Sequence, residues 1–224
     1  MKITFLGHAC FLIETVGQKL LIDPFISANP KVENIKIDDL EPDFILLTHA
    51  HGDHVADAEA IAKRTDAMII SNYEIASYYQ NKGLKAHPLN HGGKSTFDFG
   101  VCKYVNAVHT STFPDGSNGG DPGGFVIWNS EKCIYIAGDT ALTMDMKLIP
   151  MTCPSLDCAI LPVGDNFTMD AKDAALAAEF IECDNIIACH FDTFPYIEVN
   201  KDDLIEAFGS KNLIIPEIGQ SIEL

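Results

Sequence analysis

Basic side chains are scarce in this chain. Its 224 residues include 15 lysines and arginines against 32 aspartates and glutamates, for a formal charge of −17. Binding to nucleic acid or to an anionic membrane surface depends on a basic footprint that neutralises phosphate charge. We therefore expect a small-molecule substrate as the partner, and neither a nucleic acid nor a membrane.

Long apolar runs are also missing. No stretch approaches the roughly 20 apolar residues of a membrane-spanning helix, and Met1 and Lys2 lead into a strand-like run without the pattern of a secretory signal. The seven cysteines are odd in number and spread along the chain, which is not typical of a disulfide framework. A reducing, cytoplasmic location is the simplest expectation.

No segment rich in Gly, Ser or Pro is long enough to divide the chain, and we find no internal repeat. With 47% apolar residues the chain can form one substantial core, so we predict a single domain over residues 1–224. The Gly-x-Ser-x-Gly motif and the phosphate-binding P-loop are both absent. A serine nucleophile is therefore not part of the expected chemistry.

The periodicity of apolar residues alternates between strand and helix along the chain. Predicted strands are Lys2–Leu6, Phe11–Thr15, Lys19–Asp23, Phe44–Thr48, Met68–Ser71, Val101–Val108, Gly124–Asn129, Lys132–Ala137, Cys158–Pro162, Asn185–Cys189 and Leu213–Pro216. Predicted helices are Val55–Arg64, Tyr73–Asn81, Leu142–Pro150, Ala171–Ile181 and Lys201–Phe208. This order indicates an α/β fold in which two β-sheets pack face to face between outer helices.

A dense group of potential metal ligands follows one apolar run. The run Phe44–Leu47 is typical of a buried strand, and the sequence Thr-His-Ala-His-Gly-Asp-His comes directly after it. Neutral imidazole suits zinc, iron or nickel, and a carboxylate adds negative charge. Because the end of a buried strand is a rigid place to hold a metal, we predict as ligands His49, His51, Asp53 and His54.

Three more candidate ligands stand where other apolar runs end. They are His109 after Tyr104–Val108, Asp139 after Cys133–Gly138 and His190 after Ile186–Cys189. A lone histidine near a core is more often structural than a ligand. Strand ends at one edge of a sandwich can converge, however, so these positions favour a shared metal site.

The chain resembles the metallo-β-lactamase superfamily of hydrolases. The resemblance begins with the His-x-His-x-Asp-His motif and spans nearly the whole chain. Within the superfamily, the chain is similar to a branch of metal-dependent hydrolases related to ascorbate-6-phosphate lactonase. That similarity lies in Gly7–Cys10, Leu21–Pro24, Gly138–Thr140 and His190–Pro195.

The resemblance implies an αββα sandwich of two mixed sheets flanked by helices, with two divalent metal ions per chain. One metal would be held by His49, His51 and His109. The other would be held by Asp53, His54 and His190, with Asp139 bridging the two. Zinc is the default metal, and manganese, iron and nickel are the other candidates.

Further residues are assigned supporting or catalytic roles. Asp53 is predicted to position the nucleophile or return a proton, as well as to bind metal. His8 would contact substrate or a metal-bound water, or else be a buried strand-end histidine with a backbone partner. Asp23 would accept the outer N–H of a ligand histidine, or be a plain turn residue before Pro24. Thr140 would orient the Asp139 carboxylate.

Three loops are candidates for the walls of a substrate pocket. Thr110–Gly124 follows His109 directly and is polar and turn-forming; the alternative is an ordinary mobile surface loop. Asp165–Thr168 and Thr193–Pro195 follow other strands and are the two further candidates.

Hydrolysis is the predicted activity. The resemblance implies that a metal-bridging hydroxide cleaves an ester-type bond, a lactone or a phosphodiester, of a small anionic substrate. Three alternatives stay open: a non-catalytic metal-binding scaffold, an RNA-processing nuclease of the same superfamily, and a redox enzyme. The His-x-His form of the motif argues against redox chemistry, and the acidic charge argues against the nuclease. The sequence does not predict an oligomeric state.

Overall fold

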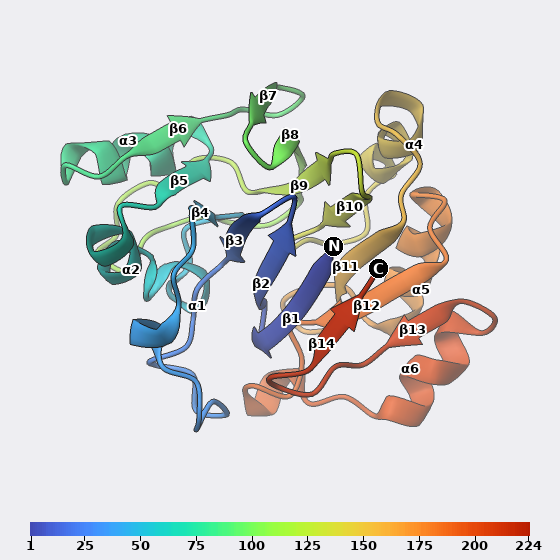
Figure 1. Cartoon of the computed structure of the whole chain (residues 1–224). Helices are drawn as coiled ribbons and strands as arrows, with labels where there is room; N and C mark the ends of the chain where they lie inside the picture. Colours follow the sequence, from blue (N-terminus) through green and yellow to red (C-terminus); the bar gives the residue numbers. More distant parts are fainter.

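Two mixed β-sheets of seven strands each pack face to face, with helices on both outer surfaces (Figure 1). The computed structural model describes residues 1–224. The predicted αββα sandwich is confirmed. None of the helices is both long enough and apolar enough to cross a lipid bilayer.

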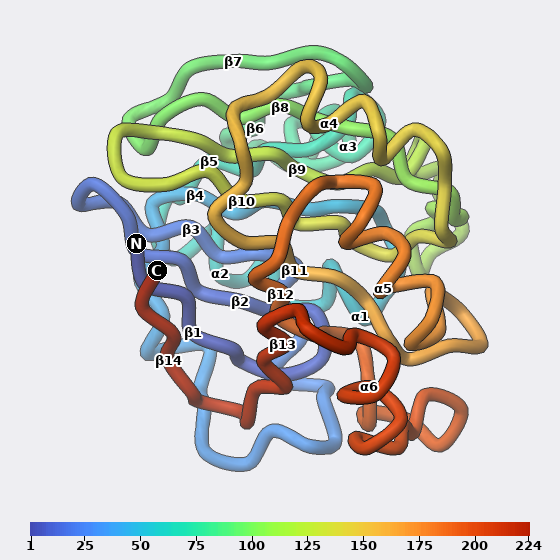
Figure 2. The backbone as a smooth tube through the Cα atoms, turned by 90° about the vertical axis from the view of Figure 1, so that its right-hand side faces the viewer, coloured from blue at the N-terminus to red at the C-terminus, as the bar shows by residue number.

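The first sheet is built mainly from the N-terminal part of the chain. Its strands, in spatial order, are β14 (Ser221–Glu223), β1 (Lys2–Gly7), β2 (Cys10–Thr15), β3 (Gln18–Ile22), β4 (Phe44–Leu46), β5 (Met68–Ser71) and β6 (Ala86–Pro88). Pairing is antiparallel from β14 to β3 and parallel from β3 to β6. Because β14 pairs with β1, the two ends of the chain lie side by side (Figure 2).

The second sheet repeats this pattern. Its spatial order is β7 (Lys94–Phe97), β8 (Gly100–Asn106), β9 (Gly123–Trp128), β10 (Cys133–Ile136), β11 (Cys158–Pro162), β12 (Asn185–Cys189) and β13 (Asn212–Ile214). Pairing is antiparallel from β7 to β10 and parallel from β10 to β13. The sheet therefore changes from antiparallel to parallel in its middle, as the first one does.

The helices cover the two outer faces. The first sheet is covered by α1 (Gly52–Val55), α2 (Ala58–Thr65) and α3 (Tyr73–Asn81), and the second by α4 (Leu148–Thr152), α5 (Ala171–Phe180) and α6 (Lys201–Phe208). Short 3₁₀ turns are η1 (Ile37–Asp39), η2 (Met144–Lys147) and η3 (Pro195–Ile197).

Side chains alternate between two cores along each central strand. In β4 and the residue after it, Phe44 and Leu46 join the core between the sheets, whereas Ile45 and Leu47 pack under α1–α3. A third core lies between the second sheet and α4–α6. Since both faces of these strands are buried, they appear in the sequence as continuous apolar runs.

One predicted helix is broken in two. The pattern predicted a helix over Val55–Arg64, but α1 ends at Val55 and α2 begins at Ala58. The break lies at Asp57, whose backbone N–H donates to the carbonyl of Pro24 at 3.1 Å. Its carboxylate accepts hydrogen bonds from the backbone of Ile26 at 2.6 Å and of Ser27 at 3.0 Å. Tertiary bonds to the 24–27 segment thus interrupt the helix.

Other boundaries and three short strands also differ from the prediction. The predicted helix Leu142–Pro150 is a 3₁₀ turn followed by α4, and the predicted strand Leu213–Pro216 is β13, ending at Ile214. Strands β6, β7 and β14 were not predicted. All three lie at sheet edges and bury few side chains, so their apolar pattern is weak.

The strand directions bring several chain segments to one edge. Strands β1, β3 and β4 run the same way in the first sheet, and β8, β10, β11 and β12 run the same way in the second. The segments that follow these strands carry His8, Asp23, the motif Thr48–His54, His109, Asp139 and His190.

Gly138 is needed for the approach of the two sheets beside Asp139. It has a φ of +64°, and a Cβ added there would lie 2.7 Å from the Cβ of Thr48. Gly17 has a similar φ of +78° but no heavy atom within 4 Å.

We predict that Gly17→Ala lowers the free energy of unfolding by about 1 kcal/mol through backbone strain alone. Gly138→Ala should lower it by about 2–4 kcal/mol, because overpacking adds to the strain.

Urea unfolding of the metal-free proteins measures both losses. Equal losses in the two variants would show that the contact between Gly138 and Thr48 is not tight.

Candidate metal centre

Several candidate residues have a strained backbone at the strand ends. His8 follows β1 with a φ of 58°, Asp23 follows β3 with a φ of 41°, and His190 follows β12 with a φ of 55°. Residues other than glycine rarely adopt this left-handed region, at a cost of about 1–3 kcal/mol each. The rest of the fold supplies the stability that holds them there, as is common at functional sites.

Three histidines form a first group. His49, His51 and His109 each place a ring nitrogen within 4.8 Å of the others. The Nε2 of His49 lies 3.0 Å from the Nδ1 of His51. His51 thus presents Nδ1 to the group, while its Nε2 lies 3.2 Å from the hydroxyl oxygen of Thr110.

A second group contains three predicted ligands and His8. His8, Asp53, His54 and His190 also place their donor atoms within 4.8 Å of one another. The Nε2 of His8 lies 3.1 Å from Oδ2 of Asp53, and its Nδ1 lies 2.9 Å from the hydroxyl of Thr193. His8 is buried, but its ring bonds to side chains and not to a backbone group.

Asp139 lies between the two groups. Its Oδ2 is 3.0 Å from the Nε2 of His190 and 3.4 Å from that of His54. The same oxygen is 3.6 Å from the Nε2 of His109 and 3.9 Å from that of His49. One carboxylate oxygen therefore faces histidines of both groups.

Several polar atoms at this centre have no partner at a hydrogen-bonding angle, although two of them lie 3.0 Å and 3.4 Å from Oδ2 of Asp139. They are Oδ1 of Asp139, Nε2 of His54, and both ring nitrogens of His190. A buried polar atom left unpaired costs about 1–3 kcal/mol. Imidazole nitrogens and carboxylate oxygens that lie this close together are typical ligands of divalent transition metals. The residues present fit a metal ion.

Asp23 contacts the outer ring nitrogen of a candidate ligand histidine, as predicted. Its Oδ2 lies 2.8 Å from the Nδ1 of His54, and it also accepts hydrogen bonds from Thr48, at 2.8 Å from the backbone N–H and 2.6 Å from the hydroxyl. With Nδ1 engaged, the Nε2 of His54 is directed at Asp139. A carboxylate in this place fixes the tautomer and orientation of the ring.

The predicted role of Thr140 is wrong. Its hydroxyl does not bond to Asp139: it donates to the carbonyl of Ala141 at 2.7 Å and accepts from the backbone N–H of Val108 at 3.0 Å. Val108 directly precedes His109. Thr140 therefore anchors the segment that carries His109 and does not orient the Asp139 carboxylate.

The loop Thr110–Gly124 packs against the metal-ligand motif. The hydroxyl of Ser111 accepts from the backbone N–H of Ala50 at 3.1 Å and donates to the carbonyl of Gly119 at 2.9 Å. Ala50 stands between His49 and His51, so this loop supports the motif. Sequence reasoning did not single out Thr110 and Ser111, although their position directly after His109 was a signal.

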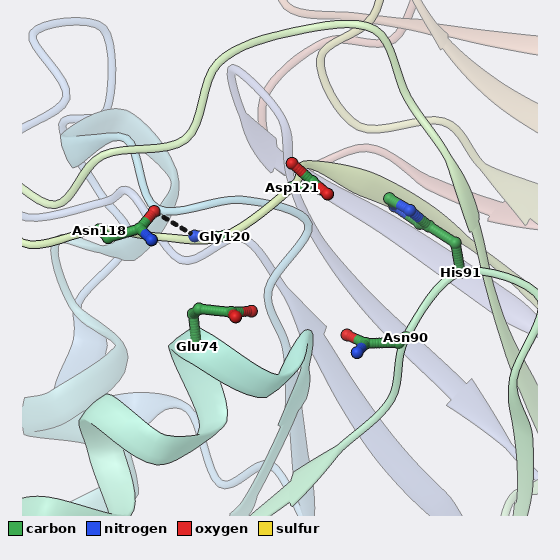
Figure 3. Close-up of a pocket in the computed structure, with 6 residues that line it drawn as sticks. All are labelled: Glu74, Asn90, His91, Asn118, Gly120 and Asp121. Carbon is green, nitrogen blue, oxygen red and sulfur yellow. Dashed lines mark hydrogen bonds between the residues drawn. The ribbon is translucent and has the colours of Figure 1, made fainter.

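The other side of the same loop lines a separate polar hollow of about 390 Å³ (Figure 3). Its lining residues are Glu74, Asn90, His91, Asn118, Gly120 and Asp121. None of them belongs to the two groups of donors. The Nε2–H of His91 donates to the carbonyl of Pro122 at 2.9 Å, and its ring stacks on Tyr104, so His91 has a structural role here.

Charges at the centre are strongly coupled. Burial alone would lower the pKa of His54, but Asp139 and Asp23 beside it raise that pKa well above the ordinary 6.5. Burial alone would raise the pKa of Asp139, but His190 and His54 hold it well below the ordinary 3.8. Burial also lowers the pKa of His49 well below 6.5, so its ring is neutral and can donate a lone pair.

Comparisons with known proteins find relatives that are named metal-dependent hydrolases. A family model described as a β-lactamase superfamily domain matches residues 2–190. A UPF0173 metal-dependent hydrolase of Flavobacterium johnsoniae is 60% identical over 226 residues, and one of Christiangramia forsetii is 57% identical over 227 residues; each match covers 100% of both chains. The solved structure of a metallo hydrolase from the archaeon Ignicoccus hospitalis has a TM-score of 0.89 at 30% identity, covering 99% of this chain and 97% of that chain.

Burial lowers the pKa of His8 from 6.5 to about 4, although its hydrogen bond with Asp53 opposes the shift. Below pH 6.5 the unfolded chain binds a proton at His8 that the folded chain does not bind. The stability contribution of His8 is therefore complete above pH 6.5 and is lost as the pH falls toward 4. We predict that this residue accounts for about 2 kcal/mol of stability lost by the metal-free protein between pH 7 and pH 5.

Urea unfolding of metal-free wild type, His8→Gln and His87→Gln at both pH values tests this prediction. His8→Gln should reduce the loss, while His87→Gln, a change outside both donor groups, should leave it unaltered. An unreduced loss in His8→Gln would contradict the assignment.

Proposed function

The chain belongs to the β-lactamase superfamily and, within it, to the UPF0173 family of metal-dependent hydrolases, and we propose that it hydrolyses an ester-type bond with two divalent metal ions. The bond is that of a lactone or a phosphodiester in a small anionic substrate. One observation carries the proposal: Oδ2 of Asp139 lies within 3.9 Å of ring nitrogens from both groups of histidines.

One metal would be held by His49, His51 and His109, and the other by Asp53, His54 and His190. Asp139, which faces both groups, would serve both metals. His51 would offer its Nδ1, which its contact with Thr110 at Nε2 supports. Zinc is the metal we propose, because imidazole and carboxylate donors suit it; manganese, iron and nickel accept the same donors. The centre draws on both sheets, which supports a single domain over residues 1–224.

Two divalent metals in this centre would supply activation of a water near neutral pH and polarisation of the oxygen of the bond that is cleaved. The side chains of the protein orient the reactants and move the protons. Asp53 is the carboxylate of the centre that reaches solvent, with 29% of its side chain exposed. It is therefore placed to take a proton from the attacking water and return it to the leaving group.

His8 holds that carboxylate in position. Its Nε2–Asp53 contact of 3.1 Å and its Nδ1–Thr193 contact of 2.9 Å fix the ring at both nitrogens. The His8 side chain has no exposed surface, so it acts through Asp53 and not by touching the substrate. This gives His8 a positioning role that differs from both alternatives expected from the sequence, contact with substrate or a metal-bound water and a backbone partner.

Asp139→Asn tests the proposal because it keeps the shape of the side chain and removes the charge. We predict loss of at least one metal per chain by elemental analysis. We also predict a fall in kcat of roughly 100-fold or more on a panel of an aryl phosphodiester and a sugar-phosphate lactone. Asp184→Asn, at an exposed carboxylate outside the centre, is the matched control.

Turnover by the wild type and the control, but not by Asp139→Asn, would support hydrolysis and identify the bond class. Full metal occupancy in Asp139→Asn with unchanged turnover would overturn the bridging role. Bound iron with visible absorbance and no hydrolysis would favour redox chemistry instead.

A further inference from the structure

Two loops at the metal-bearing edge of the sandwich expose aromatic side chains. Phe167 lies in the loop after β11, with 50% of its surface exposed, and Tyr196 lies in the loop after β12, with 74% exposed. Their ring centroids are 6.3 Å apart and the rings meet edge to face at 75°. Residues 29 positions apart in the chain thus form one exposed aromatic pair.

The two loops that carry this pair begin beside the metal centre. Phe194, two residues before Tyr196, is half-buried, and its ring centroid lies 5.5 Å from that of His8. The other loop begins at Gly164, where an added Cβ would lie only 2.1 Å from the carbonyl oxygen of His190. Both loops therefore start in contact with residues of the second donor group and extend outward from it.

The loop conformations hold the rings away from the core. Asp165 and Asn166, directly before Phe167, have φ angles of 57° and 48°, and Asp192, before Tyr196, has a φ of 56°. Hydrogen bonds close both loops, at 3.0 Å between Asp165 N–H and the Met169 carbonyl and at 2.7 Å between Asp192 N–H and the Ile197 carbonyl. Backbone strain and exposed aromatic surface both cost stability. Binding of a ligand to this surface would bury the exposed rings and so offset part of that cost.

The carboxylates of the centre have no lysine or arginine as an ion-pair partner. The seven basic side chains that form ion pairs do so with carboxylates other than Asp23, Asp53 and Asp139. Lys31 and Lys201 line a hollow of about 320 Å³ together with His8, Asp192 and Thr193. Neither Phe167 nor Tyr196 lines this hollow.

We propose that Phe167 and Tyr196, with Phe194 beside His8 on the same loop as Tyr196, bind an aromatic substituent of the substrate whose reacting group lies at the metals. The proposal rests on the proposed function, because it takes the metal centre as the place of reaction. It makes these residues determinants of specificity. Flat rings in edge or offset contact with phenylalanine and tyrosine gain more than their buried area alone supplies.

Two phosphonates that differ only in their substituent test this proposal without the need for turnover. Methylphosphonate and phenylphosphonate carry the same anionic group for the metals, and calorimetric titration of the zinc-loaded protein gives a Kd for each. We expect phenylphosphonate to bind roughly tenfold or more tightly than methylphosphonate. In Phe167→Ala/Tyr196→Ala, this advantage should fall to about twofold while the Kd of methylphosphonate stays unchanged.

Tyr73→Ala, at an exposed tyrosine on α3 (58% exposed), is the matched control and should keep the full advantage. Tyr196→Ala alone should lose part of the advantage of phenylphosphonate, so the proposal can still be tested if the double variant does not fold. An unchanged ratio of the two Kd values in the double variant would overturn the proposal. If the ratio is unchanged and the double variant also forms a smaller assembly in light scattering, the aromatic pair contacts a second copy of the chain, and the proposal is likewise overturned.

Failure of the proposed function has a different signature. If neither phosphonate binds the zinc-loaded wild type, or if zinc itself does not bind, the metal centre is wrong and the aromatic proposal falls with it. If both bind with equal affinity, the metal centre stands and only the aromatic proposal is overturned.

Discussion

The coupling of Asp139 to the histidines around it is the interaction on which the rest of the site depends. A buried carboxylate is costly unless positive charge lies beside it. Here the compensating groups come from both sheets, since His54 follows β4 and His190 follows β12. The charge balance of this one carboxylate therefore ties together the ends of strands in both halves of the sandwich.

In a metal-dependent hydrolase the strand ends that carry the ligands must be rigid, because a shift of about 1 Å at a catalytic group can lower the rate about 100-fold. The structure shows where the rigidity comes from. Asp23 bonds His54 and Thr48 at once, and Ser111 bonds the backbone of the motif between two ligand candidates. Positions that orient the donors are thus themselves held by hydrogen bonds to a second segment of chain.

The two sides of the centre differ in chemical character. The first donor group borders the polar loop Thr110–Gly124, which provides hydroxyl groups such as that of Thr110 at His51. The second group borders the aromatic loops that carry Phe167, Phe194 and Tyr196. A substrate lying across the centre would meet polar groups at one end and aromatic rings at the other.

The sequence by itself determined the layer order, the central strands and the identity of the seven candidate ligands, because these follow from local patterns. Continuous apolar runs mark strands buried on both faces, and ligands stand directly after them. Tertiary structure alone decided the contact of His8 with Asp53, the true partners of Thr140, the break at Asp57 and the meeting of Phe167 with Tyr196. It also decided the edge strands β6, β7 and β14. Each of these depends on segments distant in the chain that come together only when the sheets pack, so no local pattern of residues encodes them.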